Sequence, residues 1–184
     1  MNFISHSNLK GEHALLSPSN YHWLNYDESK FKEYFTNIKA KERGTDLHAL
    51  AEEHIRLGVR ASKSKNTLDM YINDAIGYRM QPEVVLYYSD ICFGTADAIS
   101  FKNNMLRIHD LKTGKTKPSI SQLEIYAALF CLEYHINPND INMELRLYYQ
   151  DDIIKHEPNP SDISDIMDKI VESSKLYFEI ERGE

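Results

Sequence analysis

The chain has 184 residues, 42% of them apolar, which suits one globular domain over residues 1–184 with a substantial buried core. It has no run of about 18 apolar residues and no signal-peptide pattern at its start, which excludes a membrane span and favours a cytoplasmic protein with no membrane role. The two cysteines, Cys92 and Cys131, each lie in an apolar segment, which favours buried thiols over a disulfide or a metal site.

The net charge of −7 is unevenly distributed along the chain. Residues 150–184 contain 10 acidic residues against 4 Lys and Arg, which leaves 18 acidic residues against 17 Lys and Arg in residues 1–149. The main body of the protein is therefore close to neutral. We expect its affinity for any polyanion to be modest and sensitive to salt.

The amino-terminal third predicts several helices. Residues 11–24 begin as a loop and become helical after a serine and a proline that suit a first turn. Residues 25–43 have aromatic positions at helical spacing, which favours an amphipathic cover or a lid. A separate helix is predicted over residues 46–57, with Thr45 as its N-cap and Gly58 as its stop.

The next segment moves from helix to strand. Residues 67–80 have the spacing of another amphipathic helix, and Gln81 with Pro82 ends it. Residues 83–88 predict the first strand. Glu83 is either an additional acid beside a functional site or a charged residue at a strand edge.

Two runs of strand character follow, over residues 92–101 and 105–111. The Asn103-Asn104 pair between them predicts a two-residue hairpin turn. This register places Asp97 directly opposite Asp110 on one face. The apolar pattern supports the same register independently, because it pairs Ile99 with Ile108 and Phe101 with Leu106.

Two opposed carboxylates need a neutralising partner. Their Cβ atoms would lie about 5 Å apart, and at an effective dielectric of 20 they would repel by on the order of 3 kcal/mol. A hard divalent cation would offset this repulsion, and Lys112, on the same face as Asp110, would point at whatever the cation binds. A shared proton, or a solvated salt bridge from Lys112 to either acid, is the alternative.

The remaining elements complete a mixed sheet. A helix capped by Ser119 or Ser121 runs to about Tyr134, with Gln122 and Tyr126 beside its apolar stripe. A strand over residues 141–149 and an acidic helix over about residues 161–179 follow. The order of helices, three strands, helix, strand and helix predicts an α/β fold of the α+β type with a mixed sheet.

Four motifs occur in order along the chain, within roughly residues 11–150. They resemble those of the RecB-like branch of the PD-(D/E)xK nucleases, which includes phage and CRISPR-associated exonucleases. The motifs are Gly44-Thr-Asp-Leu-His48, Gly94-Thr-Ala-Asp97, Asp110-Leu-Lys112-Thr-Gly114-Lys115 and Gln122-x-x-x-Tyr126.

The resemblance implies a fold and a metal site. The fold would be a restriction-endonuclease-like αβββαβ core over about residues 44–150, with extra N-terminal helices and a C-terminal helix. His48, Asp97, Asp110 and the Leu111 carbonyl would hold Mg²⁺ or Mn²⁺. Several relatives hold an iron–sulfur cluster on four cysteines, and two cysteines exclude such a cluster within one chain.

The resemblance also implies roles for the residues around the metal. Lys112 would orient the attacking water and stabilise charge in the transition state. Gln122 and Tyr126 would border the site and seat the DNA backbone or the metal-bound water. Glu52, one turn after His48, is a candidate to orient the imidazole.

The function implied is that of a metal-dependent deoxyribonuclease. It would be an exonuclease or end-processing enzyme in phage or mobile-element recombination or repair, acting on DNA ends beside a recombination or repair protein. Two alternatives remain open. One is a non-catalytic accessory protein with a nuclease fold that docks a basic partner through its acidic C-terminal helix. The other is a metal-dependent enzyme that acts on RNA or on a protein-held nucleic acid.

Overall fold

The computed structural model describes residues 16, 22, 24–114 and 118–182. The chain divides into two compact units, Met1–Glu42 and Arg43–Glu184. The helix predicted within residues 11–24 lies almost entirely outside the described residues. In the first unit, Tyr26 precedes helix α1, and its ring packs edge to face on the rings of Phe31 and Tyr34 in the first turns of that helix.

Helix α1 runs without interruption over Glu28–Leu57. The prediction that a separate helix begins at an N-cap on Thr45 is therefore wrong. Gly44 lies inside the helix, and a Cβ atom built there would come within 2.8 Å of Thr113 Oγ1. The glycine therefore allows the loop after the third strand to approach the helix closely. The predicted stop is confirmed, because Gly58 follows the helix with φ of +68°.

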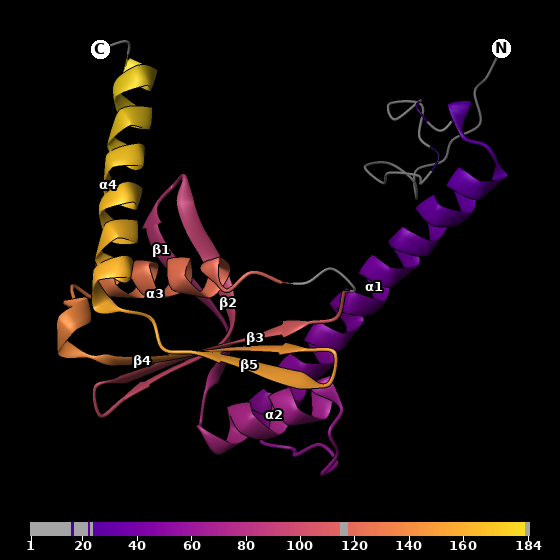
Figure 1. The fold of residues 1–184 in the computed structure, drawn as a ribbon, viewed down its shortest axis with the longest axis horizontal. Coiled ribbons are helices and arrows are strands. Elements are labelled where there is room, and N and C mark those ends of the chain that lie inside the picture. Colours follow the sequence, from indigo (N-terminus) through magenta and orange to yellow (C-terminus); the bar gives the residue numbers. More distant parts are fainter. Residues whose placement is uncertain (1–15, 17–21, 23, 115–117, 183–184) are drawn as a thin grey trace, which may run out of the picture. The chain divides into compact units, whose positions relative to one another are not determined.

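The second unit contains a mixed sheet, as the sequence predicts, and it has five strands where the sequence predicts four (Figure 1). The strands lie in the order β1-β2-β3-β4-β5, and only the β3–β4 pair is parallel. The crossover between these two strands contains helix α3. The strands are β1 Gln81–Ser89, β2 Cys92–Lys102, β3 Met105–Lys112, β4 Asn142–Tyr149 and β5 Asp152–His156.

The β2–β3 hairpin has the register that the sequence predicts. Asn103 and Asn104 both have positive φ, at 52° and 56°, as a two-residue type I′ turn requires. Ile99 pairs with Ile108 and Phe101 with Leu106. The last pair of the ladder is Ala98 with His109, so Asp97 and Asp110 are the next positions in the same register.

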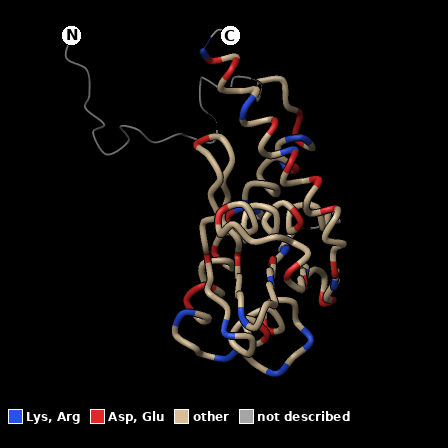
Figure 2. Tube along the Cα trace, turned by 90° about the vertical axis from the view of Figure 1, so that its left-hand side faces the viewer, with Lys and Arg blue, Asp and Glu red and all other residues tan. Residues whose placement is uncertain are grey.

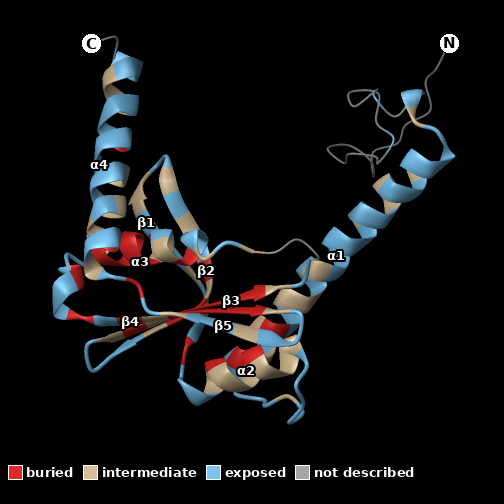
Figure 3. Cartoon of the chain, viewed as in Figure 1, coloured by how far each residue is buried: buried red, intermediate tan, exposed pale blue. Residues whose placement is uncertain are grey.

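Helices cover both faces of the sheet in this unit (Figures 1 and 3). Helix α3, Ser121–Glu133, and helix α4, Pro160–Arg182, bury one core with Leu106, Ile108 and Leu145, here called the α3-side core. Helix α2, Thr67–Gly77, and the end of α1 bury a second one, the α2-side core, with Leu111 and Tyr148. Two packed faces explain why β4 is buried almost throughout.

Three local details qualify the sequence predictions. The N-cap of α3 is Ile120, not Ser119 or Ser121, although the Ser119 hydroxyl accepts a hydrogen bond from the Ser121 amide. Cys131 is buried and Cys92 is half-buried, and both are free thiols. Within the described part of the chain, none of the helices has both the length and the apolar character needed to cross a membrane.

Candidate metal centre

The centre is built at an interruption of the β1–β2 ladder. Pairs form on both sides of the break, Pro82 with Ala98 and Val84 with Ala96, but not between Glu83 and Asp97, which lie opposite each other in the same register. In a regular strand, Ala96 and Ala98 would face the same side of the sheet, because they are two residues apart. Instead, Ala96 packs in the α3-side core and Ala98 in the α2-side core. The side chains of β2 therefore change faces between these two residues.

The backbone of Glu83 is strained at the break. Its φ of +52° lies in the left-handed region, which is rarely adopted by a residue with a long side chain. Such a conformation costs ~1–3 kcal/mol and persists only where the surrounding structure imposes it. Since strain of this kind concentrates at functional sites, it favours a functional explanation for Glu83.

Asp97 lies where β2 and β3 separate. Its Oδ2 accepts a hydrogen bond from the Leu111 amide at 2.9 Å, so the carboxylate takes the place of a backbone partner. Asp97 Oδ2 also lies 3.4 Å from Nδ1 of His48, which projects from α1. The structure therefore brings two of the predicted metal ligands together.

Three side chains form a possible ligand set. His48, Glu83 and Asp97 each offer one donor atom, and these atoms lie within 4.8 Å of one another. Burial, reinforced by the charge of Asp110, raises the pKa of Asp97 to about 7, although the Leu111 amide and Lys112 act in the opposite direction. Burial and then the charge of Asp97 raise the pKa of Glu83. Both carboxylates therefore lack sufficient positive charge around them.

Asp110 contributes a second, deeper carboxylate. Its side chain is 2% exposed, and Lys112 Nζ donates a hydrogen bond to its Oδ1 at 3.0 Å. Burial raises the pKa of Asp110 even though Lys112 lowers it. Its buried Oδ2 lies 3.0 Å from the same Lys112 Nζ, so both carboxylate oxygens share one ammonium and Oδ2 accepts no hydrogen bond of its own from the described residues. A buried carboxylate that is neutralised by a single shared ammonium, beside the three donors of His48, Glu83 and Asp97, fits a divalent cation with oxygen and imidazole ligands.

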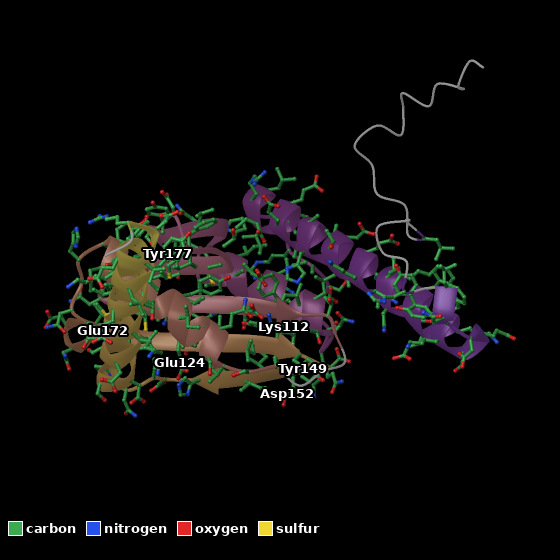
Figure 4. The ribbon with its side chains drawn as sticks, turned by 90° about the horizontal axis from the view of Figure 1, so that it is seen from above. Lys112, Glu124, Tyr149, Asp152, Glu172 and Tyr177 are labelled. Atoms are coloured by element: carbon green, nitrogen blue, oxygen red, sulfur yellow. The ribbon has the colours of Figure 1, made fainter. Side chains whose placement is uncertain are left out.

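Lys112 connects β3 to α3. Its Nζ donates a second hydrogen bond to Oε1 of Gln122 at 2.7 Å, and its side chain is 30% exposed. In Figure 4, Lys112 lies at the same end of the sheet as Tyr149, its partner in the β3–β4 ladder. The ammonium is thus held by Asp110 and Gln122 and is still accessible to solvent.

Tyr126 lies one turn after Gln122 on α3 and packs on the hairpin. A Cβ atom at Gly94 would lie 2.9 Å from Tyr126 Cε1 and 3.4 Å from its hydroxyl. Gly94 therefore allows α3 to approach β2 closely at a position three residues before Asp97. The ring holds the strand that contains Asp97 against the helix that contains Gln122.

The sequence left the position of Glu83 open and did not single out Tyr71. Tyr71, on α2, is 2% exposed, and its pKa is raised first by burial and then by the charges of Asp97, Glu83 and Asp110. The influence of all three acids on one ring indicates how tightly they cluster.

Two predicted roles around the metal have no contact among the described residues to support them. Glu52 forms its ion pair with Arg56, and no contact in this part of the chain supports its predicted role in orienting His48. Coordination by the Leu111 carbonyl stays a prediction.

The chain matches no model of a known protein family, no curated protein and no solved structure. The chemistry of this site must therefore support any functional proposal by itself.

Proposed function

We propose that the protein is a metal-dependent nuclease that hydrolyses phosphodiester bonds in DNA in the cytoplasm, as an exonuclease or end-processing enzyme. The observation that supports this most directly is the convergence of His48, Glu83 and Asp97 beside a buried Asp110 and a positioned Lys112. Acidic ligands with one exposed ammonium suit a negatively charged substrate that arrives with a divalent cation.

The residues divide into two functional groups. Asp97, Asp110, Glu83 and His48 would hold Mg²⁺ or Mn²⁺. Because the pKa of Asp97 is raised to about 7, binding near that pH must displace a proton from this carboxyl group, and the pKa values of Glu83 and Asp110 are raised in the same direction. A bound cation would activate a water molecule and offset charge on the phosphate. Lys112 would stabilise the negative charge that develops on the phosphate.

Lys112 would act on the substrate phosphate. Its hydrogen bonds to Asp110 and Gln122 fix the ammonium, so little reorganisation is needed when negative charge develops on the phosphate oxygens. Gln122 positions Lys112 from α3, and Tyr126 keeps that helix against Gly94. These residues account for three of the four sequence motifs.

The test is a separation of binding from turnover in Lys112→Met. We expect single-turnover cleavage of labelled DNA in Mn²⁺ to fall by about 100-fold or more, because one well-aimed donor contributes ~3 kcal/mol in comparable sites. Mn²⁺ affinity and DNA affinity measured in Ca²⁺ should change little, because the carboxylates remain. Lys155→Met, on an exposed position of β5, is the matched control.

Single-stranded DNA, double-stranded DNA and RNA should be compared in the same assay. Cleavage within a few-fold of the parent would remove Lys112 from the mechanism. Absence of cleavage of any of the three substrates by the parent protein in Mn²⁺ would contradict the proposed activity itself.

A non-catalytic docking role has one observation in its favour. Helix α4 exposes Leu176, Tyr177 and Ile180, at 57%, 44% and 68%, among acidic residues such as Glu172 (Figure 4). An acidic helix with exposed apolar side chains suits a basic partner protein with an apolar groove. If the parent protein does not cleave nucleic acid, α4 becomes the feature to test.

A further inference from the structure

A cavity of about 580 Å³ opens beside the second half of β2, and none of the candidate metal ligands lines it. It lies between the second half of α3, the neighbouring parts of β1 and β2, and the turn after α2. Phe101, on its wall, is four residues beyond Asp97, or about 13 Å along the strand at ~3.3 Å per residue. Its volume lies within the range of ~300–1,000 Å³ typical of small-molecule sites.

The walls of this cavity are aromatic and partly exposed. Phe101 packs on Phe130 with ring centroids 5.2 Å apart, and Phe130 packs on Tyr134 at 4.9 Å. Phe101 is 42% exposed and Tyr134 is 53% exposed, so their faces are available to a flat ligand. Gln81 and Ser100 add an amide and a hydroxyl to the lining, which can bond to the polar edge of a ring.

The cavity is also bordered by uncompensated positive charge. Arg79 and Lys102 line it, and neither has an acidic partner within ion-pair distance among the described residues. The guanidinium groups of Arg107 and Arg146 lie over the ring of Tyr78 at 4.5 and 4.8 Å, and both are ion-paired. Figure 2 shows Lys and Arg positions gathered on the loops at the bottom of the view.

We propose that this cavity binds a nucleotide. The base would lie against Phe101 and Tyr134 with its edge toward Gln81 and Ser100, and the phosphate would lie between Arg79 and Lys102. An inorganic anion would leave the aromatic rings without a contact, and an uncharged aromatic compound would leave the two cations without a partner. A nucleotide would engage both. The nucleotide is either a free nucleoside monophosphate or the terminal nucleotide of a strand.

This site is separate from the metal centre and does not depend on the proposed function. Its test therefore uses the full chain in EDTA, where no divalent cation is present. Calorimetric titration should show binding of deoxyadenosine monophosphate, with deoxyadenosine about tenfold weaker and inorganic phosphate weaker still. A single-stranded hexanucleotide in a parallel titration distinguishes a free nucleotide from a strand end.

Two variants separate the two halves of the recognition. Lys102→Gln should weaken nucleotide binding about tenfold and leave deoxyadenosine binding unchanged. Phe101→Leu should weaken both about tenfold, because it removes the stacking ring and keeps most of the volume. Lys155→Gln and Phe93→Leu, exposed on β5 and on the β1–β2 hairpin, are the matched controls.

The possible outcomes are distinct. Binding of the monophosphate, or of the hexanucleotide alone, that is weakened by Lys102→Gln supports the proposal and identifies the source of the nucleotide. Equal binding of deoxyadenosine and its monophosphate overturns the role of the two cations. Absence of binding of both the monophosphate and the hexanucleotide at millimolar concentration overturns the nucleotide site.

Discussion

Replacement of Asp97 by Asn tests the electrostatics of the candidate metal centre without reference to catalysis. The pKa of Asp97 is raised from its ordinary value of 3.8 to about 7, first by burial and then by the charge of Asp110. The folded protein therefore holds this proton more tightly than the unfolded chain does. Its contribution to stability is complete below about pH 4 and is lost as pH rises through about 7.

The magnitude follows from the same two values. A separation of about three pH units between the folded and unfolded pKa corresponds to ~4 kcal/mol of the free energy of unfolding. Relaxation of the side chain, which is 16% exposed, reduces this figure, so we expect ~2–4 kcal/mol. Asn cannot ionise, and its side-chain oxygen can still accept the hydrogen bond from the Leu111 amide.

The assay is urea denaturation in EDTA across pH. At about pH 8, Asp97→Asn should be more stable than the parent by ~2–4 kcal/mol, and the difference should shrink as pH falls until the two differ little at about pH 4. Added Mn²⁺ should stabilise the parent at the higher pH and not the variant. Asp165→Asn, exposed on α4, is the control and should keep the pH slope of the parent. Parallel slopes for the parent and Asp97→Asn would refute the argument that burial strains this carboxylate.

Two further predictions concern glycines at close approaches, both measured by urea denaturation. Gly94→Ala should cost ~1–3 kcal/mol, because its Cβ would lie 2.9 Å from Tyr126 Cε1, whereas Gly77→Ala, with nothing within 4 Å, should be neutral or stabilising. Equal effects would show that α3 yields at this contact. Gly44→Ala should gain ~1 kcal/mol of helix propensity only when Thr113→Ala removes the hydroxyl 2.8 Å away. The same effect in both backgrounds would mean that Thr113 moves freely.

The sequence predicts most of the fold because its signals are local. The Asn103-Asn104 turn and the alternation of apolar residues determine the β2–β3 register, and five pairs of the ladder follow it. The continuous helix through Gly44 could not be predicted. The glycine is required there by the close approach of Thr113, which lies almost 70 residues away in the chain. Strand β5 was not predicted, although Gln150 and Asp151, with φ of 48° and 59°, form its hairpin turn.

In the candidate site too, the residues placed by local signals could be predicted and the residue placed by a distant contact could not. Asp97, Asp110 and Lys112 lie on one hairpin, so their proximity follows from strand register, and the hydrogen bond from Lys112 to Gln122 agrees with the predicted order of motifs. Glu83 could not be placed from sequence alone. Its position depends on a break in the β1–β2 ladder and on a left-handed backbone that no local pattern of residues announces.

The break at Glu83 also has a consequence for the free edge of the sheet. Strand β1 is an edge strand, and a regular edge of nine residues would be a template for another chain to add a strand. Pro82 has no amide hydrogen, Glu83 turns the backbone out of line, and the Tyr87 amide donates to Glu133 on α3 at 2.9 Å. The irregularity that brings the Glu83 carboxylate to the candidate metal centre therefore also makes strand β1 a poor template for edge-to-edge pairing.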